Sequence, residues 1–241
     1  MGAAACYTGR PPPLCVHCLS LRGARSIKEE VLIRPTFFQH YDGVVVDWKY
    51  VRDRTEEALE REARWIGLQS LRVVVDLSSG INLYPDLRLV DNAHGEYVES
   101  MAAIGELLGK MERLGARDLM LALHRYPENN MTRQQTWASW EASLREIAAQ
   151  ARARHITLHL RLERGRPPEK VGKALELLEH VGAVNLRLAA SDAGIPRDRL
   201  GLWLLSDREA GAAPVAGVPV VFDAVYGDRD EEYRHRRRLR D

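Results

Sequence analysis

The sequence lacks any apolar run that approaches the roughly 18 residues needed to cross a bilayer, and its N-terminus lacks the charged and apolar regions of a signal peptide. We therefore expect a cytoplasmic protein. Its charge is also nearly balanced, because 35 Lys and Arg stand against 34 Asp and Glu, which leaves a net charge of +1. Such a balance provides no global field to attract acidic polymers or surfaces, so neither nucleic acid nor a membrane is expected as a partner.

Cysteine is scarce, and all three cysteines, Cys6, Cys15 and Cys18, lie in the first 18 residues. Cys15 and Cys18 have the C-x-x-C spacing of half a zinc site, and Cys6 could supply a third ligand. However, no second Cys/His pair follows closely, and the preceding "RPPP" favours an extended chain. We therefore expect residues 1–28 to form an irregular N-terminal segment, with a zinc or redox site as the alternative. Residues 29–241 are expected to form one domain, because this length can bury a full core.

The chain has no G-x-G-x-x-G or P-loop pattern, which argues against an open nucleotide-binding sheet. Short apolar runs instead alternate with longer helical patterns. An eighth strand is expected upstream of seven clear ones, within "EEVLIRPTFF" at residues 29–38. The seven clear runs predict strands at 43–48, 71–77, 118–124, 156–163, 184–190, 201–207 and 218–223.

The helical patterns between these strands carry their own start and stop signals. Thr132 followed by Gln135 predicts a capping box at the start of a helix. Gly115 and Gly182 stand where C-terminal caps belong, the first after a helix whose apolar face is expected to begin at Val98. Since each helix links two strands, the repeated β-α-β units predict parallel strands.

Nearly every expected strand finishes on a polar side chain. A closed parallel barrel brings all of its strand ends to one C-terminal face, whereas an open sheet scatters them. We therefore predict an α/β fold of the parallel (β/α)8 TIM-barrel type, irregular at its N-terminus. The strand-end residues that favour it are Asp47, Asp76, His124, Glu163, Asp192, Asp207 and Asp223.

From about residue 56 to residue 223, the order of elements resembles the xylose isomerase-like TIM-barrel superfamily, which includes sugar isomerases, sugar epimerases and AP endonucleases. A helix ending in Leu-Gly-Ala, a strand ending in His and an Ala-rich helix before a long apolar strand form the shared rhythm. The stretches that carry it are "EREARWIGLQSLRVVVD", "MERLGARDLMLALHRYPEN", "ASLREIAAQARARHITLHLRLE" and "GLWLLSD".

The resemblance implies a divalent metal, Zn, Mn or Mg, held by Glu, Asp and His at the strand ends. His124, Asp207 and Asp223 match or lie near such residues of the superfamily. Three other positions depart from its pattern, with Arg161 in place of a ligating Glu, Ala189 in place of an Asp and Leu204 in place of a His. No metal is therefore expected, unless Glu163 and Asp192 take over the missing positions.

The stretch "HITLHLRLE" alternates along residues 155–163. If Leu158, Leu160 and Leu162 face the helices, then His159, Arg161 and Glu163 face the barrel interior, and the same parity sends Asn185 and Arg187 inward. An unpaired buried guanidinium costs several kcal/mol, so at least one strand-end carboxylate should pair with Arg161. The simplest interpretation of such an interior is a salt-bridge network without a ligand.

Two long polar connections, 76–92 and 124–130, are expected to lie over the barrel mouth. We predict a sugar or sugar-phosphate isomerase or epimerase-like barrel that binds a small polyhydroxylated carbohydrate there, with oligomeric state open. The alternatives are a non-catalytic barrel that has lost its metal and acts as a binding or scaffold module, and a metal-dependent hydrolase of the AP endonuclease type. The expected catalytic residues are His124, Glu163, Asp207 and Asp223; the expected substrate-binding residues are Arg161, Arg187, Asp76, His94 and Glu128.

Overall fold

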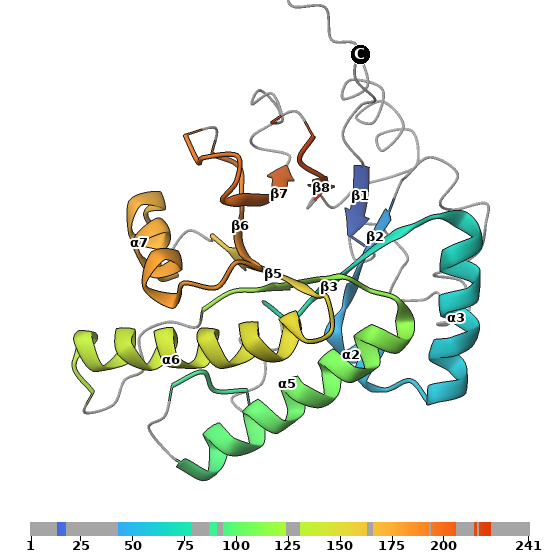
Figure 1. Cartoon of the computed structure of the whole chain (residues 1–241), viewed down its shortest axis with the longest axis horizontal. Helices are drawn as coiled ribbons and strands as arrows, with labels where there is room; N and C mark the ends of the chain where they lie inside the picture. The colour runs from blue at the N-terminus through green and yellow to red at the C-terminus, as the bar shows by residue number, and fades with distance from the viewer. Residues whose placement is uncertain are drawn as a thin grey trace, which may run out of the picture.

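The structure is a computed structural model in which eight parallel strands form one closed barrel, with helices packed around it (Figure 1). It describes residues 14–17, 43–78, 87–90, 94–123, 131–162, 166–192, 194–205, 215 and 217–222. The strands are β1 (Leu14–His17), β2 (Gly43–Asp47), β3 (Arg72–Asp76), β4 (Asp118–Leu121), β5 (Thr157–Arg161), β6 (Leu186–Ala190), β7 (Leu200–Leu205) and β8 (Val220–Phe222).

The barrel closes in chain order, because each strand pairs in parallel with the next and β8 pairs with β1. This confirms the predicted TIM-barrel fold, and all seven clear apolar runs form strands. Two of them, "GVVVD" and "RVVVD", each contain three consecutive valines, whose β-branched side chains fit a sheet buried on both sides. The two strands pair in register from Gly43↔Arg72 to Asp47↔Asp76.

The first strand corrects the expected N-terminal boundary. β1 lies at Leu14–His17, inside the segment that was expected to be irregular, and pairs with both β2 and β8. The prediction of an irregular segment up to residue 28 is therefore wrong for these four residues. A four-residue run after a Pro-rich stretch gives little periodic signal, and its stability comes from the ladders on both sides. Residues 29–38, the expected eighth strand, lie outside the described part of the chain.

Five helices of the described chain connect the strands: α2 (Trp48–Arg52), α3 (Glu56–Gln69), α5 (His94–Leu114), α6 (Arg133–Arg152) and α7 (Val171–Val181). The capping box of α6 is confirmed, because the Gln135 N–H donates to Thr132 Oγ1 at 3.2 Å and the Thr132 N–H donates to Gln135 Oε1 at 2.8 Å. Gly115 and Gly182 adopt the left-handed conformation at φ 77° and 68°, as expected for helix C-caps. Val98 was assigned to the apolar face of α5, but its side chain is 51% exposed.

Two apolar layers stabilise the barrel. The larger lies between strands and helices and includes Leu158 and Leu160 of β5. The smaller fills the barrel interior, with members Val45, Val74, Met120, Ala189, Leu202, Leu204 and Val221. The predicted alternation of β5 is thus confirmed at Leu158 and Leu160, which face the helices.

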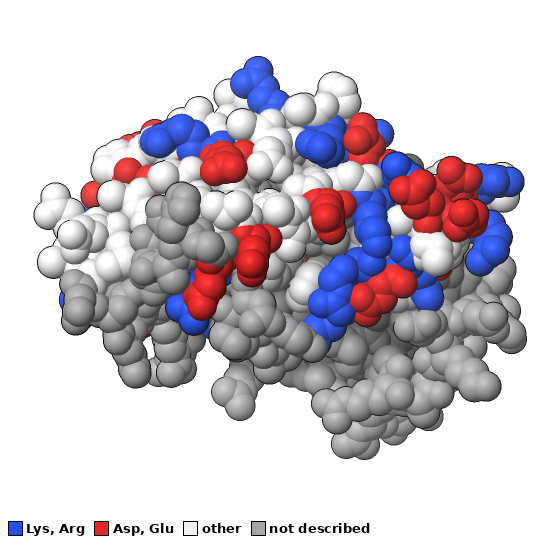
Figure 2. All heavy atoms as spheres, turned by 90° about the horizontal axis from the view of Figure 1, so that it is seen from below, with Lys and Arg blue, Asp and Glu red and all other residues white. Residues whose placement is uncertain are grey.

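On the face shown in Figure 2, Lys and Arg side chains lie beside Asp and Glu over the described helices, without a region of one sign. The mixture agrees with the balanced composition of the chain. No helix in the described ranges combines the length and the apolar character that a membrane span requires.

Candidate functional site at the C-terminal end of the barrel

Asp76 and Arg161 end strands β3 and β5, so the parallel barrel brings both to its C-terminal end. Arg161 Nη1 lies 3.5 Å from Asp76 Oδ2, and the two side chains are only 16% and 6% exposed. The other carboxylate oxygen of Asp76 accepts a hydrogen bond from the Ser78 N–H at 2.8 Å. The predicted pairing of Arg161 with a strand-end carboxylate is therefore confirmed for Asp76.

Aliphatic side chains lie in register with Arg161 on the neighbouring strands inside the barrel. Ala189 is in register with Arg161 on the next strand, and Leu202 follows Ala189 on β7. Ala189, Leu202 and Leu204 all belong to the interior apolar cluster. The guanidinium of Arg161 thus has aliphatic side chains on one side and the Asp76 carboxylate on the other. Such a low-dielectric setting strengthens its interaction with any anionic or hydroxylated group.

A second polar cluster occupies the N-terminal half of the barrel interior. The Asp118 carboxylate accepts two hydrogen bonds from Arg72, Nε to Oδ2 at 2.8 Å and Nη2 to Oδ1 at 2.7 Å. Its Oδ1 also lies 2.8 Å from His159 Nε2, and the side chains of Asp118 and His159 are 4% and 1% exposed. Burial by itself raises the pKa of Asp118, but the hydrogen bonds and charges of His159 and Arg72 outweigh it and lower the pKa to about 2.

The inward orientation of His159 followed from the alternation of β5, whereas its partner Asp118 was missed. Asp118 opens strand β4 and shares a strand face with Met120, which lies in the barrel interior. The available signal was therefore parity along "DLML", which places an aspartate inside the barrel once Met120 is assigned there. An aspartate at the start of a strand is easily taken for a turn residue instead.

His159 packs against an irregularity in β7. The ladder between β6 and β7 passes from Leu188↔Leu200 to Ala189↔Leu202, so Gly201 is an extra residue on β7. A Cβ atom at Gly201 would overlap the His159 ring. The bulge also explains why Leu200 packs in the outer apolar layer and Leu202 in the interior.

The structure describes only some of the remaining predicted site residues. Arg187 lies in register with His159, second in its strand and exposed, and no described contact joins it to Arg161. His94 is the first residue of α5, but its side chain is not described. The predicted convergence at the mouth stays a prediction, because the residues concerned lie outside the described ranges: His124, Glu128, Glu163, Asp207 and Asp223.

Asn185 does not point into the barrel, contrary to the parity argument. It precedes β6, and its Nδ2 donates to the carbonyl oxygens of Ala148 in α6 and Ile156, both at 3.0 Å. Strand alternation does not extend to this turn residue. Its side chain links the start of β5 and β6 to a helix on the outside.

The residues described at this end of the barrel do not fit a divalent metal. Arg161 offers a positive charge, and Ala189 and Leu204 offer no ligand atom at the positions where the resemblance implied Glu, Asp and His. Within the described ranges, no group of three or more His, Cys, Asp or Glu could hold a metal ion.

Comparison with protein-family models and with curated protein sequences finds no match. Solved structures match well. The D-psicose 3-epimerase of Clostridium cellulolyticum H10, solved with D-tagatose, aligns with a TM-score of 0.72 at 12% identity over 94% of this chain and 95% of its own. The D-allulose 3-epimerase of Methylomonas sp., in complex with D-allulose, gives a TM-score of 0.66 at 14% identity over 91% and 86% of the two chains.

A putative sugar phosphate isomerase/epimerase of Anabaena variabilis also aligns, with a TM-score of 0.66 at 11% identity over 95% of this chain and 88% of its own. The resemblance to the xylose isomerase-like superfamily is therefore confirmed as a resemblance of fold. The barrel of this chain is thus similar in fold to those of sugar epimerases.

Proposed function

We propose that this protein binds a small polyhydroxylated carbohydrate, a sugar or a sugar phosphate, at the C-terminal end of its barrel. The observation that carries the proposal is the Arg161–Asp76 pair, a largely buried guanidinium fixed at the end of a barrel strand. Enzymes of this fold place their ligands at this end, and the structural neighbours include epimerases solved with sugars.

The chemistry of the pair suits such a ligand. A guanidinium carries five N–H donors in one plane, so it can bind Asp76 on one edge and a hydroxyl, carbonyl or phosphate oxygen on another. The Asp76 carboxylate holds the guanidinium in place before the ligand arrives, which reduces the entropy lost on binding. Fixed cations of this kind also stabilise negative charge that develops on a substrate oxygen.

If the barrel is catalytic, the reaction in this proposal is proton transfer next to a sugar carbonyl. A base removes the proton from the carbon beside the carbonyl, negative charge develops on the carbonyl oxygen, and a proton is returned to complete the isomerisation or epimerisation. We assign the acid-base role to His124, with Glu163, Asp207 and Asp223 nearby, and the stabilisation of the oxygen to Arg161.

A second candidate is a binding or scaffold barrel without catalysis. The residues that favour it are Arg161, Ala189 and Leu204, because a guanidinium and two aliphatic side chains replace ligand atoms. Turnover separates the two: the enzyme interconverts ketohexoses or their phosphates, and the binding module retains affinity without interconversion.

The binding proposal is tested by calorimetric titration with D-allulose, D-tagatose and their 6-phosphates. Arg161→Met should weaken binding by tenfold or more, because it removes the planar donors, and Arg161→Lys should restore part of the affinity through its charge. Arg64→Met, an exposed arginine on α3, is the matched control. Thermal unfolding of each variant shows that it is folded. Equal affinity of wild type and folded Arg161→Met would exclude Arg161 from the site.

A related prediction concerns metal content. A guanidinium at about 4 Å from a divalent cation opposes its binding by several kcal/mol even at an effective dielectric of about 20. Purified protein should therefore contain no stoichiometric Zn, Mn or Mg by elemental analysis. Arg161→Glu, which replaces the cation by a ligand, should raise metal affinity if Asp207 and Asp223 lie at ligand distance. Stoichiometric metal in the wild type would restore the metal-dependent enzyme.

A further inference from the structure

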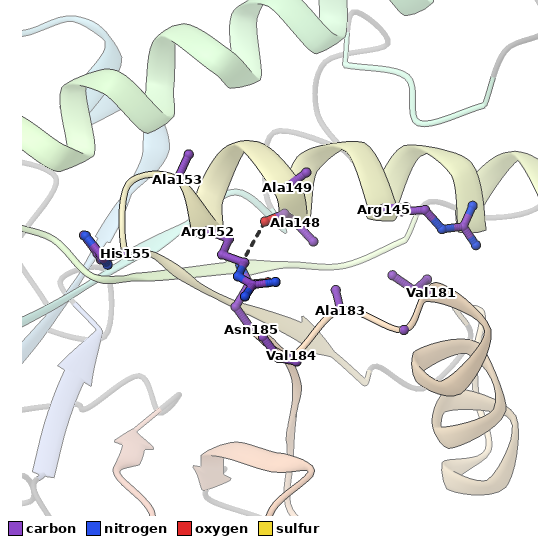
Figure 3. Close-up of a pocket in the computed structure, with 11 residues that line it drawn as sticks. Arg145, Ala148, Ala149, Arg152, Ala153, His155, Val181, Ala183, Val184 and Asn185 are labelled. Carbon is purple, nitrogen blue, oxygen red and sulfur yellow. Dashed lines mark hydrogen bonds between the residues drawn. The ribbon is translucent and has the colours of Figure 1, made fainter.

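A groove on the outside of the barrel lies at the opposite end from the proposed sugar site. It has a volume of about 680 Å³ and runs between the C-terminal half of α6 and the turn that joins α7 to β6 (Figure 3). This volume falls within the range of small-molecule sites. The residues before β5 and β6, including His155 and Asn185, also line it.

The charged and titratable side chains that line the groove are all basic, although the whole chain carries nearly equal numbers of acidic and basic residues. Its charged and titratable lining residues are Arg145, Arg152 and His155, and none of the described lining residues is acidic. Arg145 Nη2 donates to the carbonyl oxygen of His180 at the end of α7 at 2.9 Å, which holds this guanidinium at one end of the groove. Arg152, an exposed side chain, makes no hydrogen bond or ion pair with another described residue.

The spacing of the two arginines defines the shape of a ligand. Arg145 and Arg152 are seven residues apart on α6, which places them on one face of the helix with Cα atoms about 10 Å apart. Ala148 and Ala149 lie between them on the same face, so small side chains leave the space between the two cations open. Asn185 fixes the floor through its hydrogen bonds to Ala148 and Ile156.

We propose that this groove binds a small molecule with two separated anionic groups, of the class of a sugar bisphosphate. One anionic group pairs with Arg145 and the other with Arg152, and the polyhydroxylated part of the ligand lies over the two alanines. The site is independent of the proposed sugar site, because its lining residues all lie at the N-terminal end of β5 and β6 or on the adjoining helices.

The test is calorimetric titration of the whole protein at constant ionic strength with fructose 1,6-bisphosphate, fructose 6-phosphate and D-fructose as probes. We expect the bisphosphate to bind at least tenfold more tightly than the monophosphate. Ala149→Glu places a carboxylate between the two arginines, at i+4 from Arg145 and i−3 from Arg152, and should reduce bisphosphate affinity at least tenfold. Because such pairs stabilise helices, the melting temperature of Ala149→Glu should be unchanged or higher.

Arg152→Gln is a second variant, which removes one cation without filling the groove. It should lower the affinity for the bisphosphate toward the affinity for the monophosphate. Arg64→Gln removes an exposed arginine on α3 and should have no effect. Bisphosphate binding that persists in both Ala149→Glu and Arg152→Gln would place the ligand elsewhere and overturn the proposal. So would equal affinity for the bisphosphate and the monophosphate in the wild type.

Discussion

At Asp118, the cost of burying a charged carboxylate is offset by the hydrogen bonds and ion pairs of its neighbours. Its carboxylate is almost inaccessible, yet it bonds a guanidinium from β3 and an imidazole from β5. A buried charge of this kind is tolerated when its partners satisfy both oxygens, and the removal of one member leaves the others uncompensated. The cluster lies at the N-terminal end of β4, where barrel residues generally support stability.

Asp118→Asn should make the acid limb of the stability profile shallower. The pKa of Asp118 is about 2 in the folded state and 3.8 in the unfolded chain, so the unfolded chain binds the proton first as the pH falls. The carboxylate therefore stabilises the fold by about 2 kcal/mol above pH 5, and this contribution is lost between about pH 4 and pH 2. Urea unfolding between pH 6 and pH 3 measures it.

In those titrations, the wild type should lose about 1 kcal/mol more than Asp118→Asn between pH 6 and pH 3. The neutral variant should already be destabilised by roughly 3 kcal/mol at pH 6, because Arg72 and His159 lose their shared carboxylate. Asp198→Asn is the control, since its side chain is 79% exposed. Parallel pH profiles for wild type and Asp118→Asn would show that the carboxylate is not responsible.

How much of the site could be read from the sequence depended on strand alternation. The inward orientation of Arg161 and its carboxylate partner followed from the regular leucines of β5 and from the cost of an unpaired buried charge. Asp118 was missed because it opens a strand of four residues. Asn185 was misplaced because it precedes its strand, where parity no longer determines direction.

The bulge in β7 lets the backbone of this strand come close to the His159 side chain of β5. Gly201 is the extra residue of β7, and the His159 ring of β5 occupies the space where any other residue would have a Cβ atom. Glycines inside strands commonly mark a bulge or a close approach of this type. Here both occur at one residue.

Gly201→Ala should therefore destabilise the fold by roughly 1 to 3 kcal/mol, because the new methyl group forces the His159 ring or β7 to move. Thermal and urea unfolding measure the effect. In a His159→Ala background the same substitution should cost less, since the ring is gone. Gly109→Ala in α5, where nothing lies within 4 Å of the added Cβ, should be neutral or stabilising. A neutral Gly201→Ala would mean that the ring is not held at this position.

Most elements could be predicted because seven strands are longer or more apolar than their surroundings and the helices carry caps. The capping box at Thr132 and the glycine at 182 define helix ends by local chemistry, which needs no tertiary information. β1 could not be predicted in the same way. Its four residues become a strand only because β2 and β8 offer ladders on both sides.

Barrel closure is a property of the whole molecule, and it rests on β1. Val16 is in register with Val44 on one side and with Phe222 on the other. Proline cannot donate to a ladder and is excluded from strands paired on both sides. Val16→Pro should therefore open the barrel between β8 and β2 and lower the free energy of unfolding by several kcal/mol.

Urea unfolding and amide hydrogen exchange in β2 and β8 test this prediction. Val16→Thr retains the backbone N–H and the β-branched shape, so it serves as the matched control. If Val16→Pro unfolds like Val16→Thr, β1 contributes nothing to closure, and the N-terminal boundary first drawn from the sequence would stand.

The whole fold matches sugar epimerase barrels at 11 to 14% identity. Such a likeness arises because the barrel depends on the spacing of apolar residues and on strand ends, both of which tolerate wide substitution. The ligand does not follow from spacing, because it depends on a few side chains at the mouth. Arg161 and Asp76 are the described members of that set, and their test is the carbohydrate titration.

Among the residues that the structure describes, the polar side chains that bond one another inside the barrel come from three neighbouring strands, β3, β4 and β5. Arg72 and Asp76 belong to β3, Asp118 to β4, and His159 and Arg161 to β5. None of these strands can separate from the others without exposing a charge that has lost its partner. The three strands should therefore behave as one cooperative folding unit, which opens as a whole or not at all. The interior apolar residues described on β2, β6, β7 and β8 meet through aliphatic contacts, so these strands can loosen one at a time, and conformational breathing of the barrel would begin with them.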